Sequence, residues 1–139
     1  MKLLHAVCVG VVVGSAAWAA PLDGTKWKVT LTPDAESVEI GAKGWEDELV
    51  FAADQMTATT SAKRGFKTSV YLVTEDDEVL KWQTIQHSEA AGVANWSCQV
   101  SNAEMTGRLV LSQRDGTRWV FAVTGGRTSA KPGEGSKKE

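Results

Sequence analysis

The sequence predicts an all-β protein, built as a single antiparallel up-and-down barrel of about eight strands. The first observation is that four tryptophans each lie in a segment whose apolar or small residues recur at every second position. These tryptophans are Trp27, Trp82, Trp96 and Trp119. A period of two is typical of strands with one face on a core and the other in water. The second observation is that short polar linkers separate the later segments, which favours pairing of consecutive strands. Closing the sheet into a barrel would remove its exposed edges.

The first half of the predicted barrel contains three strands and one long connection. The first strand ends at Pro33, and the polar, glycine-containing stretch 34–44 follows. A connection of this length in a small domain predicts a mobile flap. One short helical turn fits 61–68, where the alternation is broken. The strands expected here cover 25–32, 48–53 and 55–60.

The second half reads as a meander of five strands with short polar turns. Asp115-Gly116 is a strong signal for a tight hairpin, because glycine accepts the positive backbone angle that such turns require. Short connections of this kind lead to sequential antiparallel pairing. The strands expected here cover 69–74, 79–87, 93–100, 105–113 and 117–124.

The first nineteen residues have the layout of a secretory signal peptide. A lysine at position 2 precedes a mostly apolar run over 3–13, and small residues follow up to Ala20, interrupted by Trp18. The apolar run is shorter than the roughly 20 residues of a transmembrane helix. We therefore expect cleavage after Ala19, export to the periplasm or the extracellular space, and no stable membrane insertion afterwards. The predicted organisation is a signal peptide over 1–19, a barrel domain over 20–125 and a disordered Gly-, Ser- and Lys-rich tail over 126–139.

Charge and cysteine content exclude several classes of function. The net charge is −2 and basic residues alternate with acidic ones, so no basic stripe suggests a nucleic-acid partner. Cys98 is the only cysteine after position 19, which excludes an intramolecular disulfide in the mature chain. Because Cys98 falls on the apolar face of its strand, we expect a buried thiol rather than a reactive one.

No constellation of residues points to catalysis or to a metal. His87 is the only histidine after position 19, and its neighbour Ser88 would point to the opposite face of the same strand. One histidine and one cysteine cannot form a familiar zinc site. We expect a protein that is not an enzyme, with no catalytic residue, no metal and no cofactor.

Several short motifs resemble those of lipocalin-like (calycin-type) barrels. Leu22-Asp23-Gly24-Thr25-Lys26-Trp27 is similar to the Gly-x-Trp opening of that family's first strand, although one extra residue separates Gly24 from Trp27. The body also resembles small exported bacterial proteins with this type of barrel. The motifs shared with them are Gly44-Trp45-Glu46-Asp47, Gly65-Phe66-Lys67, the 92–97 segment with Trp96, and Asp115-Gly116. The family's Thr-Asp-Tyr loop is missing, and Arg118 or Arg127 is the candidate for its late arginine. The resemblance implies an eight-stranded barrel with a central ligand site.

Two functions remain open from the sequence. In the first, an exported barrel binds a small apolar molecule inside or at its mouth, because an eight-stranded barrel can hold one small ligand. The candidate ligand-binding residues are Trp27, Trp82, Thr84, Gln86, Trp96, Trp119 and Phe121. In the second, these side chains fill the barrel, and the protein acts through surface contacts with a partner in the cell envelope. Trp45, expected outside any strand, is then a partner contact or a lid over one barrel end.

Overall fold

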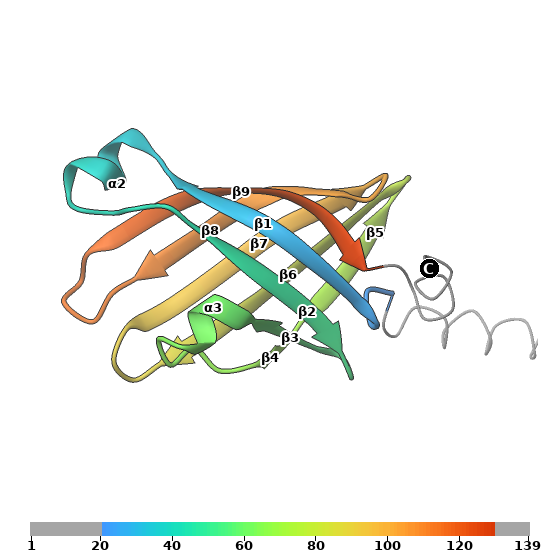
Figure 1. The fold of residues 1–139 in the computed structure, drawn as a ribbon, viewed down its shortest axis with the longest axis horizontal. Helices are drawn as coiled ribbons and strands as arrows, with labels where there is room; N and C mark the ends of the chain where they lie inside the picture. Colours follow the sequence, from blue (N-terminus) through green and yellow to red (C-terminus); the bar gives the residue numbers. More distant parts are fainter. Residues whose placement is uncertain (1–20, 130–139) are drawn as a thin grey trace, which may run out of the picture.

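A computed structural model describes residues 21–129 and shows one antiparallel sheet curled into a nearly closed barrel (Figure 1). The predicted signal peptide, 1–19, and positions 130–139 of the predicted tail lie outside the described residues. None of the helices in the described part of the chain is long and apolar enough to cross a membrane. The elements are β1 Thr25–Pro33, α2 Ala35–Glu39, β2 Trp45–Ala52, β3 Gln55–Ala58, α3 Thr59–Ala62, β4 Ser69–Val70, β5 Leu72–Asp76, β6 Val79–Ser88, β7 Gly92–Ser101, β8 Glu104–Ser112 and β9 Arg118–Ser129.

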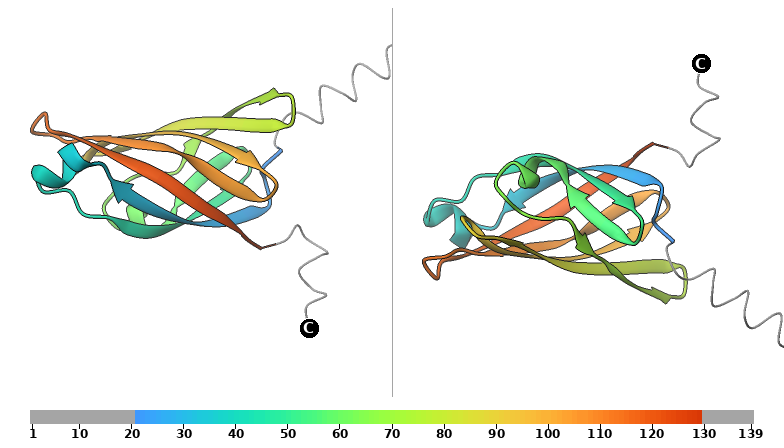
Figure 2. Two further views of the ribbon diagram at one scale, coloured as in Figure 1. Left: turned by 90° about the horizontal axis from the view of Figure 1, so that it is seen from above. Right: turned by 90° about the horizontal axis from the view of Figure 1, so that it is seen from below.

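The strand order is β4-β3-β2-β1-β9-β8-β7-β6-β5, and every neighbouring pair is antiparallel. The first and last strands of the domain, β1 and β9, lie side by side in the middle of this order (Figure 2). The predicted meander of the second half is confirmed, because β5 to β9 pair in sequence. The predicted all-β class and antiparallel barrel are also confirmed, with nine strands instead of eight.

The extra strand arises where the barrel closes. The segment predicted as one strand over 69–74 changes partner at Tyr71, so β4 pairs with β3 and β5 pairs with β6. The β5–β6 ladder ends at the Leu72–Gln83 pair. Beyond it, the Thr84 hydroxyl donates to the Val70 carbonyl at 2.7 Å and lies 2.5 Å from the Ser69 hydroxyl. We call this junction of β4 and β6 the seam; side chains replace the ladder hydrogen bonds there.

Two expectations for the first half are corrected. The stretch 34–44, expected to be a flap, contains α2 and is tied to β9 (Figure 1). The Ser37 hydroxyl accepts a hydrogen bond from the Val120 amide at 2.8 Å, and the Asp34 amide donates to the Val120 carbonyl at 2.9 Å. Trp45 begins β2, so the expectation that it lies outside a strand was wrong. The reason is that β2 starts three residues earlier than predicted and pairs Trp45 with Leu31.

β9 continues to Ser129, five residues beyond the predicted end of the last strand, so residues 126–129 belong to this strand and not to the predicted tail. Its end pairs with β1, and Gly125 allows the two backbones to come close. A Cβ added at Gly125 would lie 2.7 Å from the Val29 Cα and closer still to the Lys28 carbonyl oxygen. At Gly126 the nearest atom would be at 3.6 Å, an ordinary contact.

These distances predict different costs for two neighbouring substitutions. Gly125→Ala should lower the free energy of unfolding by about 1–3 kcal/mol, because backbone atoms of β1 must move to admit the methyl group. Gly126→Ala, the matched control, should change it by less than about 0.5 kcal/mol. Urea unfolding followed by tryptophan fluorescence measures both. Equal effects of the two changes would contradict the close approach of β9 to β1.

Candidate functional site

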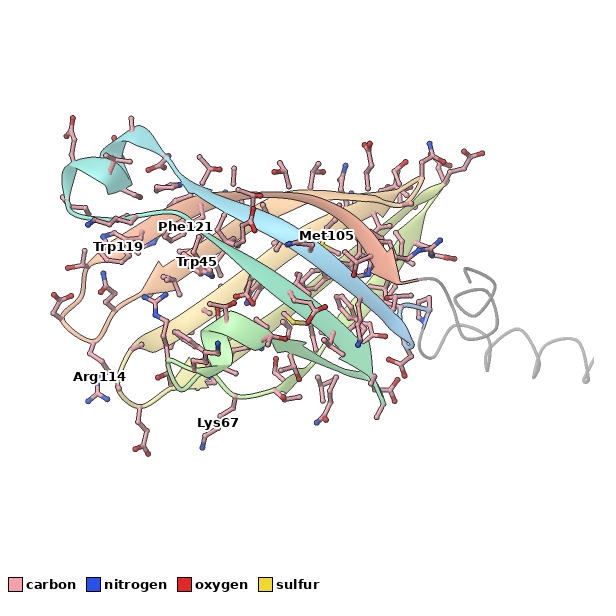
Figure 3. All side chains as sticks on the ribbon, viewed as in Figure 1. Trp45, Lys67, Met105, Arg114, Trp119 and Phe121 are labelled. Carbon is pink, nitrogen blue, oxygen red and sulfur yellow. The ribbon has the colours of Figure 1, made fainter. Side chains whose placement is uncertain are left out.

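The barrel interior holds nearly all the residues predicted to bind a ligand. Trp27, Trp82, Thr84, Gln86, Trp96 and Phe121 are at most 4% exposed, whereas Trp119 is half-buried near the end of the barrel that carries α2 (Figure 3). The alternation of β6 places Thr84 and Gln86 inward. The structure therefore brings these residues together, and their contacts decide whether they leave room for a ligand.

Three buried polar side chains of the interior, those of Trp96, Gln86 and Trp27, find partners within the protein. The Trp96 indole N–H donates to Gln86 Oε1 at 3.0 Å, and Gln86 Nε2 donates to the Met56 carbonyl at 3.3 Å. The Trp27 indole donates to the Thr25 hydroxyl at 2.9 Å. Buried polar groups need hydrogen-bond partners, and here the protein itself provides them: other strands for Trp96 and Gln86, and the same strand for Trp27.

The aromatic rings pack against one another along the interior. Trp82 stacks on Trp96 with ring centroids 6.2 Å apart, and Phe51 meets Trp82 edge to face at 5.1 Å. Phe51 also contacts Tyr71 at 4.9 Å. Offset-stacked and edge-to-face arrangements at these distances are the favoured ones for core aromatics. These four rings, three from β2, β6 and β7 and one from Tyr71 between β4 and β5, pack together where an interior ligand would lie.

Two interior donors remain without a partner. Among the described residues, the buried side-chain polar atoms that lack a hydrogen bond are Trp82 Nε1 and Trp119 Nε1. An unpaired buried N–H is rare in a native protein and calls for an explanation. Trp82 is 2% exposed, so its indole N–H is a donor in the interior with no acceptor.

Trp45 lies over one end of the barrel rather than projecting into solvent. It is half-buried, its ring meets Phe121 edge to face at 5.0 Å, and the Arg64 guanidinium lies 5.1 Å from its ring centroid. The Trp45 indole donates to Asp47 Oδ2 at 3.1 Å. These contacts are those of a lid, one of the two roles expected for Trp45.

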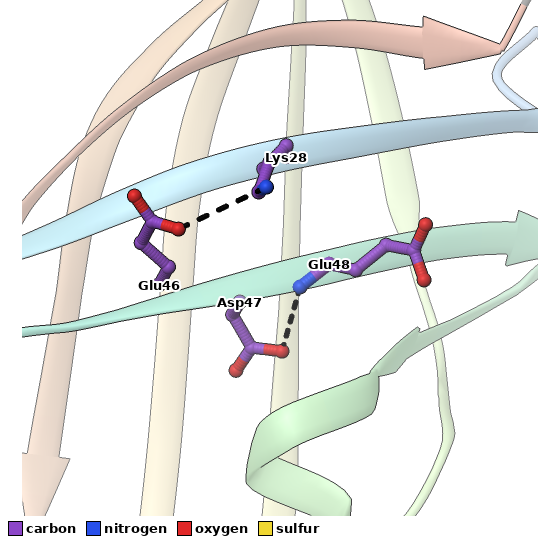
Figure 4. A network of polar contacts seen from close by, with 4 residues as sticks. All are labelled: Lys28, Glu46, Asp47 and Glu48. Carbon is purple, nitrogen blue, oxygen red and sulfur yellow. Dashed lines mark hydrogen bonds and ion pairs between the residues drawn. The ribbon is translucent and has the colours of Figure 1, made fainter.

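Sequence reasoning missed Asp47, the only buried carboxylate among the described residues, at 2% exposed. Its oxygens accept hydrogen bonds from the amides of Glu48, Thr60 and Ser61 and from the Ser61 hydroxyl, at 2.7–3.1 Å. Figure 4 shows Asp47 beside Glu48, with Lys28 and Glu46 forming an exposed ion pair at 3.9 Å. Asp47 thus anchors the first turn of α3 and the Trp45 lid. The signal that could have found it was the alternation of 45–52, which places Asp47 inward with Trp45 and Leu49.

The hollows of the molecule lie on its outer surface. One of about 690 Å³ and one of about 350 Å³ adjoin over β5, β6 and β7, where both are lined by Leu72 and Gln83. The larger is walled mainly by outward polar side chains such as Lys81 and Gln99, and the smaller by Val70 and Ile85 at the seam. A third, of about 470 Å³, lies beside the Lys28–Glu46 pair.

Aliphatic side chains form a row across the outer face next to the smaller hollow. In the strand register Ile85 is opposite Asn95, Asn95 opposite Val110, and Val110 opposite Val120. Val70, 57% exposed, extends the row across the seam, and Ile85 is 50% exposed. We call Val70, Ile85, Asn95, Val110 and Val120 the aliphatic row. The sequence signal for the aliphatic row is weak, because both faces of β6 are mixed in polarity.

Cys98 and His87 are the two remaining residues that the sequence analysis considered for chemistry. Cys98 is 5% exposed, which confirms the prediction of a buried thiol, and burial raises its pKa to about 12. His87 is exposed near the end of β6. Within residues 21–129, no group of three or more His, Cys, Asp or Glu side chains could hold a metal ion.

No protein-family model, curated protein or solved structure matches the chain.

Two glutamines on β6 give a direct test of the filled interior. Gln86→Ala should lower the free energy of unfolding by about 2–4 kcal/mol, since it creates a cavity and leaves the Trp96 indole without its acceptor. Gln83→Ala, on the outward face of the same strand, should cost less than about 0.5 kcal/mol. Urea unfolding curves provide both values. A cost for Gln86→Ala as small as that for Gln83→Ala would show that Gln86 is not part of a packed interior.

Proposed function

We propose that the mature chain is an exported, lipocalin-like barrel without enzymatic activity that acts through contacts of its outer surface with a protein partner in the cell envelope. The observation that carries this proposal is the pairing of Gln86 with Trp96 and Met56. With the interior occupied by its own hydrogen-bonded side chains, the free aliphatic groups and the hollows lie outside.

The outer surface offers a contact area at the seam. Leu72, Val70 and Ile85 are 61%, 57% and 50% exposed, and they line one hollow together. Single exposed aliphatic residues are common on soluble proteins, whereas a contiguous group marks an interaction site. Trp45, the partner contact expected from the sequence, is already engaged with Phe121, Asp47 and Arg64, so we place the contact at the seam instead.

The lipocalin-like assignment and export are part of the same proposal. The Gly24 to Trp27 motif opens β1, and Trp27 is 1% exposed inside the barrel. Arg127 is the register partner of Trp27 on β9, whereas Arg118 lies at the start of that strand. Arg127 is therefore the better candidate for the family's late arginine. Export rests on the sequence pattern of residues 1–19, which lie outside the described part of the chain.

Binding of a small apolar molecule, the first hypothesis from the sequence, remains a second candidate for one reason. The Trp82 indole N–H is buried and lacks an acceptor, and a ligand oxygen could provide one. Such a ligand would have to displace rings that now contact Trp82, among them Phe51 and Trp96. We favour surface contacts because Gln86, Trp96 and Trp27 have partners within the protein, whereas only the indole N–H groups of Trp82 and Trp119 lack an acceptor among the described residues.

Mass spectrometry distinguishes the two functions. The chain is exported into a bacterial periplasm, purified without detergent, and weighed under native and denaturing conditions. The surface-contact function predicts equal masses per chain, and the denatured mass reports whether cleavage occurred after Ala19. A reproducible extra mass that is lost on denaturation would overturn the filled barrel and identify the class of bound molecule.

A further inference from the structure

We propose that the outer edge of β5 binds an extended segment of a partner protein as an added antiparallel strand. This segment carries two basic residues followed, one residue later, by two aliphatic ones. The inference rests on the proposed function, because it names the chemistry of the partner at the outer surface. β5 is the last strand in the sheet order and pairs only with β6, and its tip lies at the end of the barrel away from α2 (Figure 1).

The backbone of the chain entering β5 alternates between two sides. In an antiparallel ladder the N–H and C=O groups of one residue point to the same side, and successive residues alternate. The Val70 carbonyl faces β6, where it accepts a hydrogen bond from the Thr84 hydroxyl. The Tyr71 amide faces the other way and donates to the Asp54 carbonyl at 3.3 Å. Even-numbered residues of β5 therefore face β6, and odd-numbered residues face the outer edge.

The outer edge of β5 thus presents the N–H and C=O groups of Val73 and Glu75. Within residues 21–129, no backbone hydrogen bond reaches these groups and no further strand pairs with this edge. A row of unpaired backbone groups is a template for another strand. Extended peptides bind to many proteins by adding a strand at such an edge, where backbone hydrogen bonds provide affinity and side chains provide specificity.

The side chains along this edge change from aliphatic to acidic. Leu72 is 61% exposed, and Val73 is half-buried and packs against the core. Positions 75–78 are Glu, Asp, Asp and Glu, and all four are exposed. Asp76 pairs with Lys81 at 3.9 Å, and no other ion pair within residues 21–129 involves this acidic run. An added strand would therefore meet aliphatic groups at one end and largely unbalanced negative charge at the other.

The direction of the added strand fixes the order of its residues. Every neighbouring pair in this sheet is antiparallel, so we expect the same of the added strand. The residues opposite Asp76 and Glu75 then come first in the partner segment and should be basic. A residue opposite Thr74 follows, and the residues opposite Val73 and Leu72 come last and should be aliphatic. Cross-strand pairs of opposite charge and of aliphatic groups both stabilise a sheet.

A second copy of this chain fits the edge less well than a basic segment does. Antiparallel pairing of two β5 strands about Thr74 would place Glu75 opposite Val73 and Asp76 opposite Leu72. Carboxylates would then lie opposite aliphatic groups at both ends of the contact, with no cation across from them. Charged residues on an edge strand are a common defence against pairing of identical edges. The same charges attract a partner that carries lysine or arginine at the matching positions.

NMR titration of the exported, mature chain with the peptide acetyl-Lys-Lys-Thr-Val-Val-amide tests the proposal. We expect saturable binding with a dissociation constant of about 1 mM or below, and the largest shifts at the amides of Val73 and Glu75. The reversed peptide, acetyl-Val-Val-Thr-Lys-Lys-amide, and the acidic peptide, acetyl-Glu-Glu-Thr-Val-Val-amide, should each bind at least about 10-fold more weakly. Equal binding of the three peptides, or no saturable shift of the two amides at about 10 mM peptide, would overturn the added strand.

Two lysine variants test the charge match. Glu75→Lys should weaken binding of the Lys-Lys-Thr-Val-Val peptide at least about 10-fold, because it places a cation opposite a lysine. Glu104→Lys is the matched control: it makes the same change of charge at an exposed position at the same end of the barrel, on β8. It should change the affinity by less than about twofold, since an exposed charge away from the contact contributes little. Equal weakening by the two variants would show a general charge effect and would contradict a site at the β5 edge.

A second pair of variants tests the backbone hydrogen bonds at constant charge. Glu75→Pro removes an amide that faces the outer edge and makes no bond to β6, whereas Glu75→Gln keeps this amide. The proline variant should bind the peptide at least about 5-fold more weakly than the glutamine variant, and equal affinities would rule out strand addition. Self-association of the wild type that Glu75→Pro abolishes would show that a second copy occupies the edge, and would also overturn the proposal.

Failure of this inference is separable from failure of the proposed function. A chain of bare mass that binds none of the peptides removes only the added strand, and surface contacts at the seam remain. A small molecule retained in the native mass spectrum removes the surface-contact function, whatever the peptides do.

Discussion

The hydrogen bond from the Trp96 indole to Gln86 is the interaction on which the interior of this barrel depends. A barrel of this size has room for its own side chains or for one small ligand, but not for both. Gln86, 1% exposed, joins Trp96 on β7 to the Met56 carbonyl on β3, so one side chain links strands that lie near the two edges of the curled sheet. With this link made, the large rings can pack around it. The space for a ligand is then occupied.

The filled interior explains why the functional features lie elsewhere. The barrel closes at the seam through hydroxyl groups of Ser69 and Thr84, and the aliphatic side chains that the interior cannot accommodate face outward beside it. Asp47 holds Trp45 and the start of α3, the short helix that connects β3 to β4. The structure thus combines a packed centre, in which Gln86, Trp96 and Trp27 have hydrogen-bond partners, with an outer face that carries exposed aliphatic side chains.

Local sequence patterns correctly predicted strand faces and a turn, because these features depend on residues close together in the chain. Alternation along β6 and β7 placed Thr84, Gln86 and Trp96 on one face, and Asp115-Gly116 marked a turn. The predictions that failed concern contacts between residues that lie far apart in the sequence. The stretch 34–44 looked unsupported, because its anchor, the bond between Ser37 and Val120, joins residues 83 positions apart. The change of partner at Tyr71 likewise depends on where β3 and β6 end in space. Asp47 was missed because β2 was expected to begin one residue after it.

The measurement that tests the filled interior most directly is native-state hydrogen exchange of the tryptophan indole N–H groups, followed by NMR. The account predicts that the indole protons of Trp96 and Trp27 exchange only when the whole domain unfolds. Their exchange free energies should therefore equal the free energy of unfolding from denaturant. Exchange of the Trp96 indole at a clearly lower free energy would mean that water reaches the interior through local opening. That result would contradict an interior held closed by its own hydrogen bonds.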